Sequence, residues 1–510
     1  MNRSLLTARI SAHAGRTAII SPEGTFTYRD LDAASCRVAS GLLAGRLDLD
    51  GARVAFFAPP GIDYVATLLG IWRAGGIAVP LAVSYPPAEL DYVIRDAQAE
   101  IVVSTSQGAD VLRPLAEAAD ARFALTTDLL TSDVGSPECD VRSVKCEGRE
   151  APDRRALILY TSGTTGKPKG VVTTHANIEA QISALVEAWE WTADDRILLV
   201  LPLHHVHGLI NVVGCALWVG ATCEMAARFD GEMVWDRLAS SELTVFTAVP
   251  TIYHRLIALW DEASPATQRD RSSGCRALRV MMSGSAALPV RTLERWREIS
   301  GHTLLERYGM TEIAMALANP LHGARQPGRV GAPLPGVTVR VVDEHGHPVP
   351  AGTPGEVEVQ GSGVFLEYWR RPEETSRAFR DGWFRTGDVA VVEEGGYRLL
   401  GRTSIDIIKT GGYKVSALEI EEVMREHPAV AECAVVGMAD AMWGEKICAA
   451  VELRPNATLT LDDLQNWAKS RLAPYKIPRV LRQVPTLPRN AMGKVVKPDV
   501  VALFQSEAPR

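Results

Sequence analysis

The most informative stretch of this chain is Tyr160-Thr161-Ser162-Gly163-Thr164-Thr165-Gly166-Lys167-Pro168-Lys169-Gly170. An apolar run from Ala156 leads into it and a β-branched run from Val171 leads out, which predicts a strand, a loop and a second strand. Backbone N–H groups freed by glycine, hydroxyl donors and lysine ammonium groups are what a polyphosphate needs around it. The stretch therefore predicts a phosphate-handling loop.

This loop differs from the Walker loop, G-x-x-x-x-G-K-[ST], which is followed by a helix. Gly166-Lys167 is followed here by Pro168, no glycine lies five residues before Gly166, and the exit is typical of a strand. The pattern argues against a P-loop nucleotide triphosphatase. The alternative is a glycine-rich hairpin turn without function, which the density of glycine, hydroxyl and lysine side chains disfavours.

Length and charge bound the remaining possibilities. A chain of 510 residues exceeds one compact core, so we expect at least two domains. Its net charge of −7 leaves no basic surface typical of nucleic-acid binding. The 8 cysteines include no C-x-x-C pair, which fits reduced thiols in a cytoplasmic protein.

Two segments raise the question of targeting. Arg3, Arg9 and Arg16 precede the first acid, as in a transit peptide, but globular-looking sequence begins by Ala18, so we expect no leader and a cytoplasmic location. Residues 197–223 contain no Asp, Glu, Lys or Arg, yet Pro202, histidines and glycines interrupt them. They predict a buried strand, a polar turn and a buried helix and not a membrane span.

Hydrophobic periodicity predicts the order of elements. Residues 1–130 alternate helical patterns with apolar strands at 54–57, 77–80 and 101–103, typical of a mostly parallel sheet. Residues 131–155 are predicted to be a surface connection. A helix over 178–189 and strands at 245–246 and 280–282 follow the loop.

The last third of the chain changes pattern twice. Short strands from residue 337 to about 400 predict a small β-rich subdomain. A compact α+β module is predicted from about residue 404, with a capping box of Ser416 and Glu419 opening a helix through Arg425, a strand at 433–436 and a helix from Thr460 to Leu472.

Further motifs follow the loop in a fixed order. They are Leu201-Pro-Leu-His-His-Val-His-Gly208, Ser283-Gly-Ser-Ala286, Glu306-Arg-Tyr-Gly-Met-Thr-Glu312, Thr386-Gly-Asp388, Gly401-Arg402, Lys409-Thr-Gly-Gly-Tyr-Lys414 and Pro488-Arg-Asn-Ala-Met-Gly-Lys494. Over nearly the whole chain this series resembles the adenylate-forming enzymes: acyl-CoA synthetases, luciferases and peptide-synthetase adenylation domains. The resemblance implies an α/β fold with a large N-terminal domain (1–402) of two α/β subdomains plus a small β-subdomain, a hinge (403–404) and a small mobile α+β C-terminal domain (405–510).

The resemblance also implies two half-reactions with ATP, Mg²⁺ and coenzyme A. A carboxylate attacks the ATP α-phosphate to give an acyl-AMP and pyrophosphate, and a thiol then takes the acyl group. Such chemistry needs charge neutralisation and positioning more than covalent help. By this resemblance Glu312, with Thr161, holds Mg²⁺, which takes few protein carboxylates. Asp388 accepts from the ribose hydroxyls, Arg402 holds ribose or phosphate oxygens, and Lys494 bridges the carboxylate and the α-phosphate.

The implied catalytic residues are Lys494, Glu312, His207 and Thr161. The implied ATP- and AMP-binding residues are Thr161, Ser162, Gly163, Thr164, Thr165, Gly166, Lys167, Ser285, Ala286, Glu306, Arg307, Tyr308, Gly309, Met310, Thr311, Asp388, Arg402 and Lys494. The implied coenzyme A residues are Lys409, Gly411, Gly412, Tyr413 and Lys414, which would replace Lys494 after a domain rotation. Ser404 is the hinge candidate, where the family often has Asp or Lys.

The acid is predicted from Arg255, which follows an otherwise apolar strand and helix start. A buried guanidinium suits a dicarboxylate, whose second carboxylate must be desolvated and paired. The surrounding motifs look like malonyl-CoA synthetases, which implies that Arg255 binds the distal carboxylate of malonate, with His207, His205, Ser283 and Met310 beside it. The alternative is a surface arginine on the first turn of a helix.

Other functions stay open at this point. They are a synthetase for another short (methylmalonate-like) or aromatic acid, a stand-alone adenylation enzyme that loads a carrier protein, and a catalytically dead relative. Glu312, Asp388, Arg402 and Lys494 together argue against the last. The expected partners are small molecules, namely malonate, ATP and coenzyme A, with no nucleic acid, no membrane and no obligate protein partner.

Overall fold

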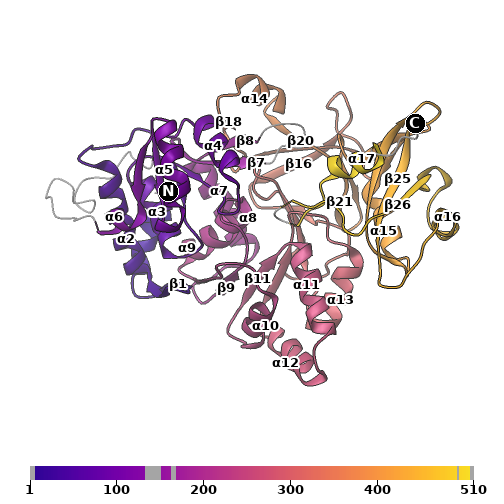
Figure 1. Cartoon of the computed structure of the whole chain (residues 1–510), viewed down its shortest axis with the longest axis horizontal. Helices are drawn as coiled ribbons and strands as arrows, with labels where there is room; N and C mark the ends of the chain where they lie inside the picture. Colours follow the sequence, from indigo (N-terminus) through magenta and orange to yellow (C-terminus); the bar gives the residue numbers. More distant parts are fainter. Residues whose placement is uncertain (1–5, 132–150, 162–167, 491–492, 506–510) are drawn as a thin grey trace.

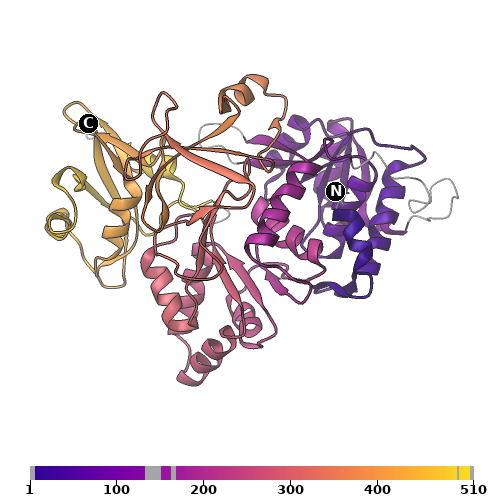
Figure 2. The ribbon, with the colours of Figure 1, turned by 180° about the vertical axis from the view of Figure 1, so that it is seen from behind.

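The computed structural model of this chain describes residues 6–131, 151–161, 168–490 and 493–505. Four β-sheets organise these residues. Figure 1 shows an α/β unit in indigo and purple at one end, the pink helices of a second α/β unit below, an orange β-rich unit above and a yellow C-terminal unit at the other end. Figure 2 shows the same arrangement from behind. The predicted α/β fold with a large N-terminal and a small C-terminal domain is confirmed.

The first sheet carries the glycine-rich hairpin. Its order is β18-β8-β7-β4-β3-β5-β6, parallel from β7 to β6, with β8 and β18 antiparallel. The strands are β3 (Arg53–Phe57), β4 (Ile77–Pro80), β5 (Ile101–Ser104), β6 (Arg122–Leu125), β7 (Arg155–Thr161), β8 (Lys169–Thr174) and β18 (Glu367–Tyr368). The strands predicted on both sides of the loop are thereby confirmed, with Thr161 opposite Lys169.

The second sheet has the order β15-β14-β13-β12-β11-β9-β10-β1-β2 and is parallel from β13 to β1. Its strands are β1 (Thr17–Ser21), β2 (Gly24–Thr27), β9 (Arg196–Leu199), β10 (Thr222–Met225), β11 (Val245–Ala248), β12 (Val280–Ser283), β13 (Leu305–Tyr308), β14 (Leu317–Ala318) and β15 (Ala332–Pro333).

The N-terminal strands correct the prediction that residues 1–130 build one sheet. Ile19 pairs with Cys223 and Ile20 with Glu224, so β1 belongs to the second sheet, and the first sheet begins only at β3. An apolar strand pattern shows burial but not which distant strand is its neighbour.

Helices cover these two sheets, and one large hydrophobic core joins them, while α4 and α5 pack on the first sheet in a separate cluster. Buried residues of α2, α3 and α7 belong to the same hydrophobic cluster as those of β9, β11 and β12. The helices of the two units are α1 (Leu6–Ala12), α2 (Tyr28–Leu43), α3 (Ile62–Arg73), α4 (Pro87–Asp96), α5 (Ala109–Ala118), α6 (Thr126–Thr131), α7 (His175–Ala188), α8 (Val206–Gly208), α9 (Cys215–Val219), α10 (Gly231–Ala239), α11 (Pro250–Asp261), α12 (Pro265–Cys275) and α13 (Val290–Ser300), with a π-helical turn η3 (Leu209–Gly214) between α8 and α9.

Two smaller sheets complete the chain. The β-rich unit contains β16 (Val337–Val342), β17 (Gly355–Gly361), β19 (Phe379–Arg380), β20 (Trp383–Glu393) and β21 (Gly396–Arg402), with helix α14 (Pro372–Ala378) before β19. The C-terminal unit contains β22 (Ile407–Thr410), β23 (Tyr413–Ser416), β24 (Val430–Asp440), β25 (Gly444–Leu453) and β26 (Val480–Gln483), with helices α15 (Ala417–Arg425), α16 (Leu461–Lys469) and α17 (Lys497–Gln505).

Two local predictions in the C-terminal unit need correction. Ser416 caps α15 by accepting from the N–H of Glu419, but its own hydroxyl donates to the Leu400 carbonyl and the Glu419 carboxylate pairs with Lys476, so only half of a capping box forms. Helix α16 ends at Lys469 and not at Leu472. Residues 197–223 form a strand, a turn and short helices as predicted, and no helix in the described ranges is long and apolar enough to cross a membrane.

Candidate active site

The predicted site residues gather where parallel strands of the second sheet end. Thr247, Ser283 and Arg307 lie at the carboxyl ends of β11, β12 and β13, and His207 lies on α8, which follows β9. Ligands of open parallel sheets bind outside this edge. The strand order, which no local pattern reveals, therefore places four side chains from distant motifs beside one another.

One group of residues, which we term the nucleotide side, consists of Tyr308, Glu312, Tyr368, Asp388 and Arg402. Asp388 on β20 lies opposite Arg402 on β21 in the strand register. Its Oδ1 accepts from Arg402 Nε at 2.9 Å and its Oδ2 from the Tyr308 hydroxyl at 2.6 Å. An ionised carboxylate accepts only, so Asp388 is fixed in place as an acceptor that can also receive ribose hydroxyls.

Glu312 is a buried carboxylate suited to a cation. Its side chain is 5% exposed, and Oε1 accepts from the Tyr368 hydroxyl at 2.9 Å. Burial raises the pKa of its carboxyl. No cluster of three His, Cys, Asp or Glu side chains that could hold a metal occurs within the described ranges. A single protein carboxylate fits Mg²⁺ bound mainly through ATP phosphates and waters.

A second group, which we term the acyl side, consists of His207, Thr247, Ser283 and Arg307. His207 is buried, and its Nδ1 lies 3.0 Å from Ser285 Oγ. Its Nε2 lies 2.9 Å from Thr247 Oγ1 and accepts a hydrogen bond from Arg307 Nη2. Because guanidinium nitrogens only donate, the ring proton belongs on Nδ1. Burial and the Arg307 charge hold the pKa of His207 well below its usual range, so the ring is neutral.

Arg307 is a buried cation without an acidic partner among the described residues. It is 4% exposed, and its side chain contacts His207, Thr247 and the Met315 sulfur. Its Nε has no hydrogen-bond partner. Burial lowers the pKa of Arg307 to about 9, which still leaves it charged at neutral pH. A desolvated, uncompensated guanidinium is a receptor for an anion.

The neighbours of Arg307 in the sheet extend this chemistry. Ser283 is fully buried and its hydroxyl has no hydrogen-bond partner in the part of the chain that the structure describes, so it is an available donor. Glu306 lies opposite Ser283 in the register. Its Oε1 accepts from the Leu288 N–H at 3.4 Å and burial raises its pKa to about 8, which makes it a neutral acid at pH 7. The Glu306 carboxyl thus faces Leu288, in the segment before α13, and is not part of the nucleotide side.

Arg255 is not the buried guanidinium that the sequence predicted. It lies on the first turns of α11, is exposed and places its guanidinium carbon 5.8 Å from the centre of the Phe229 ring. The polar residue that is buried in this part of the chain is Thr247 on β11. The alternation of buried and exposed positions on an amphipathic helix outweighs one apolar run in the sequence.

The turns that join these groups are tight. Ser285 has a positive φ of 69°, an uncommon conformation for a residue with a side chain, and it orients Oγ toward His207. A Cβ on Gly309 would lie 1.8 Å from the Ala314 carbonyl oxygen, so the turn after β13 admits only glycine. Ala286, Met310 and Thr311 are half-buried in these turns. His205 is half-buried too, and burial lowers its pKa to about 4.

The C-terminal unit brings Lys494 to the N-terminal domain. A Cβ on Gly493 would lie 3.2 Å from Thr251 Oγ1 on the first turn of α11. Asn490 holds this loop, because its Oδ1 accepts from the Lys494 N–H at 3.0 Å. Lys494 itself is exposed. The same arrangement is held by Glu422 on α15, which accepts from the Val290 N–H at 2.8 Å.

The predicted coenzyme A residues lie together on the β22–β23 hairpin. Gly411 and Gly412 form its turn with φ of 56° and 84°, and the Gly411 N–H donates to the Trp443 carbonyl. Lys409, Tyr413 and Lys414 are exposed. The Tyr413 ring stacks on Tyr475 at 4.2 Å, and the Arg479 guanidinium lies 3.6 Å from the Trp443 ring centre. Ser404 is exposed in the turn between β21 and β22.

Part of the predicted site lies outside the described residues. Ser162, Gly163, Thr164, Thr165, Gly166 and Lys167 are not among them, whereas Thr161 ends β7 and Lys169 begins β8. Sequence reasoning missed Thr247, Tyr368, Trp443 and Arg479 as site residues. For Thr247, a polar residue inside the apolar run Val245-Phe-Thr-Ala248 was a signal that could have found it. Tyr368, Trp443 and Arg479 carry no such signal in the sequence.

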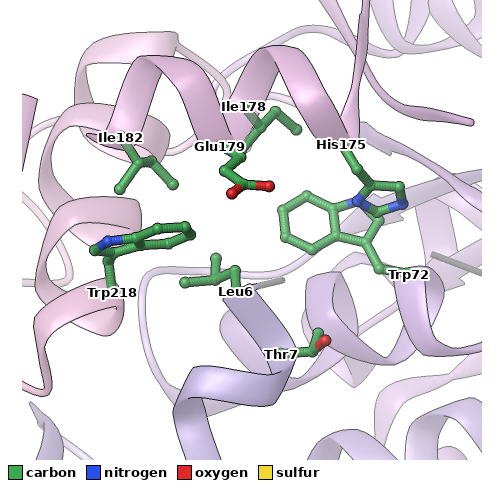
Figure 3. A pocket seen from close by; sticks show the side chains of 8 residues that line it. All are labelled: Leu6, Thr7, Trp72, His175, Ile178, Glu179, Ile182 and Trp218. Carbon is green, nitrogen blue, oxygen red and sulfur yellow. The ribbon is translucent and has the colours of Figure 1, made fainter. Parts of the chain in front are cut away.

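Two hollows lie away from these groups. A cavity of about 20 Å³ is lined by Leu6, Thr7, Trp72, His175, Ile178, Glu179, Ile182 and Trp218 (Figure 3). It lies among α1, α3, α7 and α9, and in Figure 3 the indoles of Trp72 and Trp218 flank the Glu179 carboxylate. A larger cleft of about 670 Å³ separates α13 from α15. Neither contains a residue of the nucleotide or acyl side.

Comparisons with known proteins agree with this geometry. The malonate--CoA ligase ACSF3, mitochondrial, of Xenopus laevis is 44% identical over 98% of this chain and 91% of its own length. The crystal structure of ATP-bound MatB from Rhodopseudomonas palustris matches with a TM-score of 0.89 and 35% identity, covering 98% of this chain and 99% of that chain. Apo MatB matches with the same identity and coverage but a TM-score of 0.80.

Family models cover both domains. The model described as AMP-binding enzyme matches residues 6–369, and the one described as AMP-binding enzyme C-terminal domain matches residues 419–494. The first match alone spans more than half of the 510 residues. By this match and by its identity to a full-length relative, the chain belongs to the AMP-binding enzyme family.

Proposed function

We propose that this protein is a malonyl-CoA synthetase, an acid–thiol ligase that joins malonate to coenzyme A. ATP and malonate give malonyl-AMP and pyrophosphate, and the coenzyme A thiol then displaces AMP. The family membership and the identity to a relative named malonate--CoA ligase support the reaction class. The substrate is supported by the acyl side itself.

The observation that carries malonate is the buried, unpaired Arg307. A monocarboxylic acid uses its single carboxylate in the reaction and would leave this cation uncompensated. A dicarboxylate can place its second carboxylate on the Arg307 guanidinium, with Ser283 Oγ as a further donor. Neutral His207 adds no second charge, and its Nε2 bond holds the guanidinium in place. Arg255 is exposed, so it can attract the dianion but not desolvate it.

The nucleotide side supports the adenylation half-reaction. Asp388 and Arg402 would bind the ribose, while the turn 308–311 and Ser285 with Ala286 would enclose the adenine and α-phosphate. Glu312 would hold Mg²⁺, which neutralises phosphate charge when bound. Lys494 would bridge the malonate carboxylate and the α-phosphate as a point charge. Thr161 and the loop residues 162–167 would enclose the departing phosphates.

We propose that the present conformation is the one for adenylation. The Lys494 loop lies on α11, and the match to ATP-bound MatB exceeds that to apo MatB. Rotation about Ser404 would then exchange Lys494 for the Gly411–Gly412 turn. The lysines, Tyr413, Trp443 and Arg479 around that turn offer cations and aromatic faces for the phosphates and adenine of coenzyme A.

Pyrophosphate release with malonate, methylmalonate, acetate and benzoate tests the substrate. We expect turnover with malonate and, because one methyl is worth only about 1–3 kcal/mol, a lower rate with methylmalonate. Preference for acetate or benzoate would refute the assignment. Replacing coenzyme A by an acyl-carrier protein in the same assay tests the carrier-loading alternative, since transfer only to the carrier would exclude a coenzyme A ligase.

A cytoplasmic location also remains a proposal. Among the described residues, Cys215, Cys223, Cys275, Cys433 and Cys448 are buried free thiols, which fits a reducing compartment. The mitochondrial matrix is reducing too, and the Xenopus laevis relative carries the word mitochondrial in its name. Cell fractionation with the full-length native protein distinguishes the two.

A further inference from the structure

Side chains from distant segments hold both ends of the glycine-rich hairpin. On the entry side, the Tyr160 hydroxyl donates to Asp96 Oδ2 at 2.8 Å. On the exit side, the Tyr92 hydroxyl donates to the Pro168 carbonyl at 2.8 Å. Asp96 and Tyr92 both lie on α4, so this helix contacts the last residues of β7 and the residue before β8.

A second pair of side chains extends these contacts to Lys169. Arg371 Nη2 lies 3.2 Å from Asp96 Oδ1, and Arg371 Nη1 lies 3.5 Å from Glu374 Oε1. The Glu374 carboxylate in turn forms an ion pair with Lys169. Tyr160, Asp96, Arg371, Glu374 and Lys169 therefore form one continuous polar chain from the end of β7 to the start of β8.

The segment that supplies Arg371 and Glu374 also holds Glu312. Tyr368 on β18 donates its hydroxyl to Glu312 Oε1, and the Phe365 N–H donates to the Glu312 carbonyl at 2.8 Å. Lys169 Nζ lies 5.2 Å from the centre of the Tyr368 ring. One segment, residues 365–374, thus contacts both the carboxylate of the nucleotide side and the lysine at the exit of the hairpin.

The ion pair leaves Lys169 available for an anionic ligand. The Lys169 and Glu374 side chains are 34% and 33% exposed. An ammonium has three donors, so Lys169 can keep Glu374 as a partner while donating to a phosphate. A lysine without such a partner samples many rotamers, and fixing it on binding costs entropy.

We propose that Glu374, held by Arg371 and Asp96, is a positioning residue for Lys169 in the ATP half-reaction. It orients the lysine so that the triphosphate meets a cation already in place. The inference rests on the proposed function, because it assigns Lys169 to the phosphates of ATP.

Glu374→Gln tests this proposal against a matched control, Glu373→Gln. Glu373 precedes it on α14, is 83% exposed and pairs only with Arg377 among the described residues. Malonate-dependent ATP–pyrophosphate exchange gives KM for ATP and for malonate, and calorimetry gives Kd for ATP. Thioester formation from supplied malonyl-AMP and coenzyme A reports the second half-reaction.

We expect Glu374→Gln to raise KM and Kd for ATP about two- to fivefold, as for an exposed ion pair. KM for malonate, the second half-reaction and the Glu373→Gln control should stay at wild-type values. Glu374→Asp keeps the carboxylate and should recover most of the loss. Unchanged or lower KM for ATP, equal losses in both half-reactions, or an Asp variant as weak as the Gln variant would each overturn the proposal.

The proposed function fails separately from this inference. Wild-type protein that shows no exchange with malonate, or no thioester from malonyl-AMP, would refute the malonyl-CoA synthetase assignment. The Glu374 comparison would then be repeated with the acid that supports exchange.

Discussion

The nucleotide side and the acyl side differ in how they treat buried charge. On the nucleotide side, Asp388 has Arg402 and Tyr308 as partners, and Glu312 has the Tyr368 hydroxyl. On the acyl side, Arg307 is 4% exposed and contacts, among the described residues, a neutral histidine, a threonine and a sulfur. Each carboxylate of the first group has a polar partner within the protein, whereas the Arg307 charge has no acidic partner among the described residues.

In the proposed function, this difference would let one site bind two ligands. ATP would make many contacts, so a preorganised set of hydrogen-bond donors and acceptors could bind it without depending on one dominant charge. Malonate is small, so its selection depends on one strong interaction. Leaving Arg307 uncompensated makes the pocket unfavourable for acids that lack a second carboxylate.

Lys494→Ala should produce the largest loss, because we propose that this lysine bridges the malonate carboxylate and the α-phosphate during adenylation. We expect malonyl-AMP formation to fall on the order of 10²–10³-fold, while thioester formation from supplied malonyl-AMP is retained. Separate assays of the two half-reactions measure this. Equal loss in both would contradict the exchange of Lys494 for the Gly411–Gly412 turn.

Arg307→Met removes the charge that distinguishes the acyl side. Removing one member of a buried pair costs about 3–5 kcal/mol, so kcat/KM for malonate should fall by about two to three decades, with Kd for ATP unchanged. The ligand-free variant should unfold at a higher temperature than the wild type, because an unpaired buried cation is gone. Malonate should stabilise the wild type but not the variant, and a variant that malonate still stabilises would locate the receptor elsewhere.

Arg255→Ala, set beside Arg307→Met, shows which of the two arginines contributes more to activity with malonate. The sequence resemblance implied that Arg255 binds the distal carboxylate of malonate, whereas its exposed position indicates a smaller loss than for Arg307→Met, about tenfold or less. The loss should shrink with added salt, because an exposed charge is screened. A salt-independent loss as large as that of Arg307→Met would restore Arg255 as the main carboxylate receptor.

Tyr308→Phe tests whether the nucleotide side tolerates the loss of one hydrogen bond. It removes one hydrogen bond to Asp388, which still has Arg402. A hydrogen bond to a charged group contributes about 1.5–3 kcal/mol, and the remaining partner should limit the rise in KM for ATP to about tenfold. A rise equal to that of an Asp388→Ala variant would mean that the pairing is not redundant.

Glu306→Gln should have the smallest effect on catalysis and a clear effect on stability. Burial raises the pKa of Glu306 from 4.5 to about 8, so the folded protein holds a proton that the unfolded chain has lost. Wild-type stability from this group is therefore complete below pH about 4.5 and lost as the pH rises toward about 8. The variant should lack this decline, which denaturant unfolding across that range measures. Identical pH profiles would place an ionised Glu306 in the folded protein.

Most elements and the order of the motifs could be predicted from the sequence. Strands at 54–57, 77–80 and 280–282 and the hairpin around the glycine-rich loop were predicted correctly, because runs of apolar residues bounded by glycine report burial and turns directly. Which of the two arginines, Arg255 or Arg307, is buried at the site could not be predicted from the sequence. Arg255 stands out in an apolar run and Arg307 lies in a charged motif, yet only Arg307 is buried.

The sequence by itself determined the reaction class, because the glycine-rich loop, Glu312, Asp388, Arg402 and Lys494 carry chemistry that their types and order specify. Tertiary structure alone decided which charges meet. It placed β1 beside β10, Arg307 beside His207, and Glu374 beside Lys169. Residue type and local period are encoded within a few turns of chain, whereas the partner of a charge depends on how strands and helices from distant segments pack.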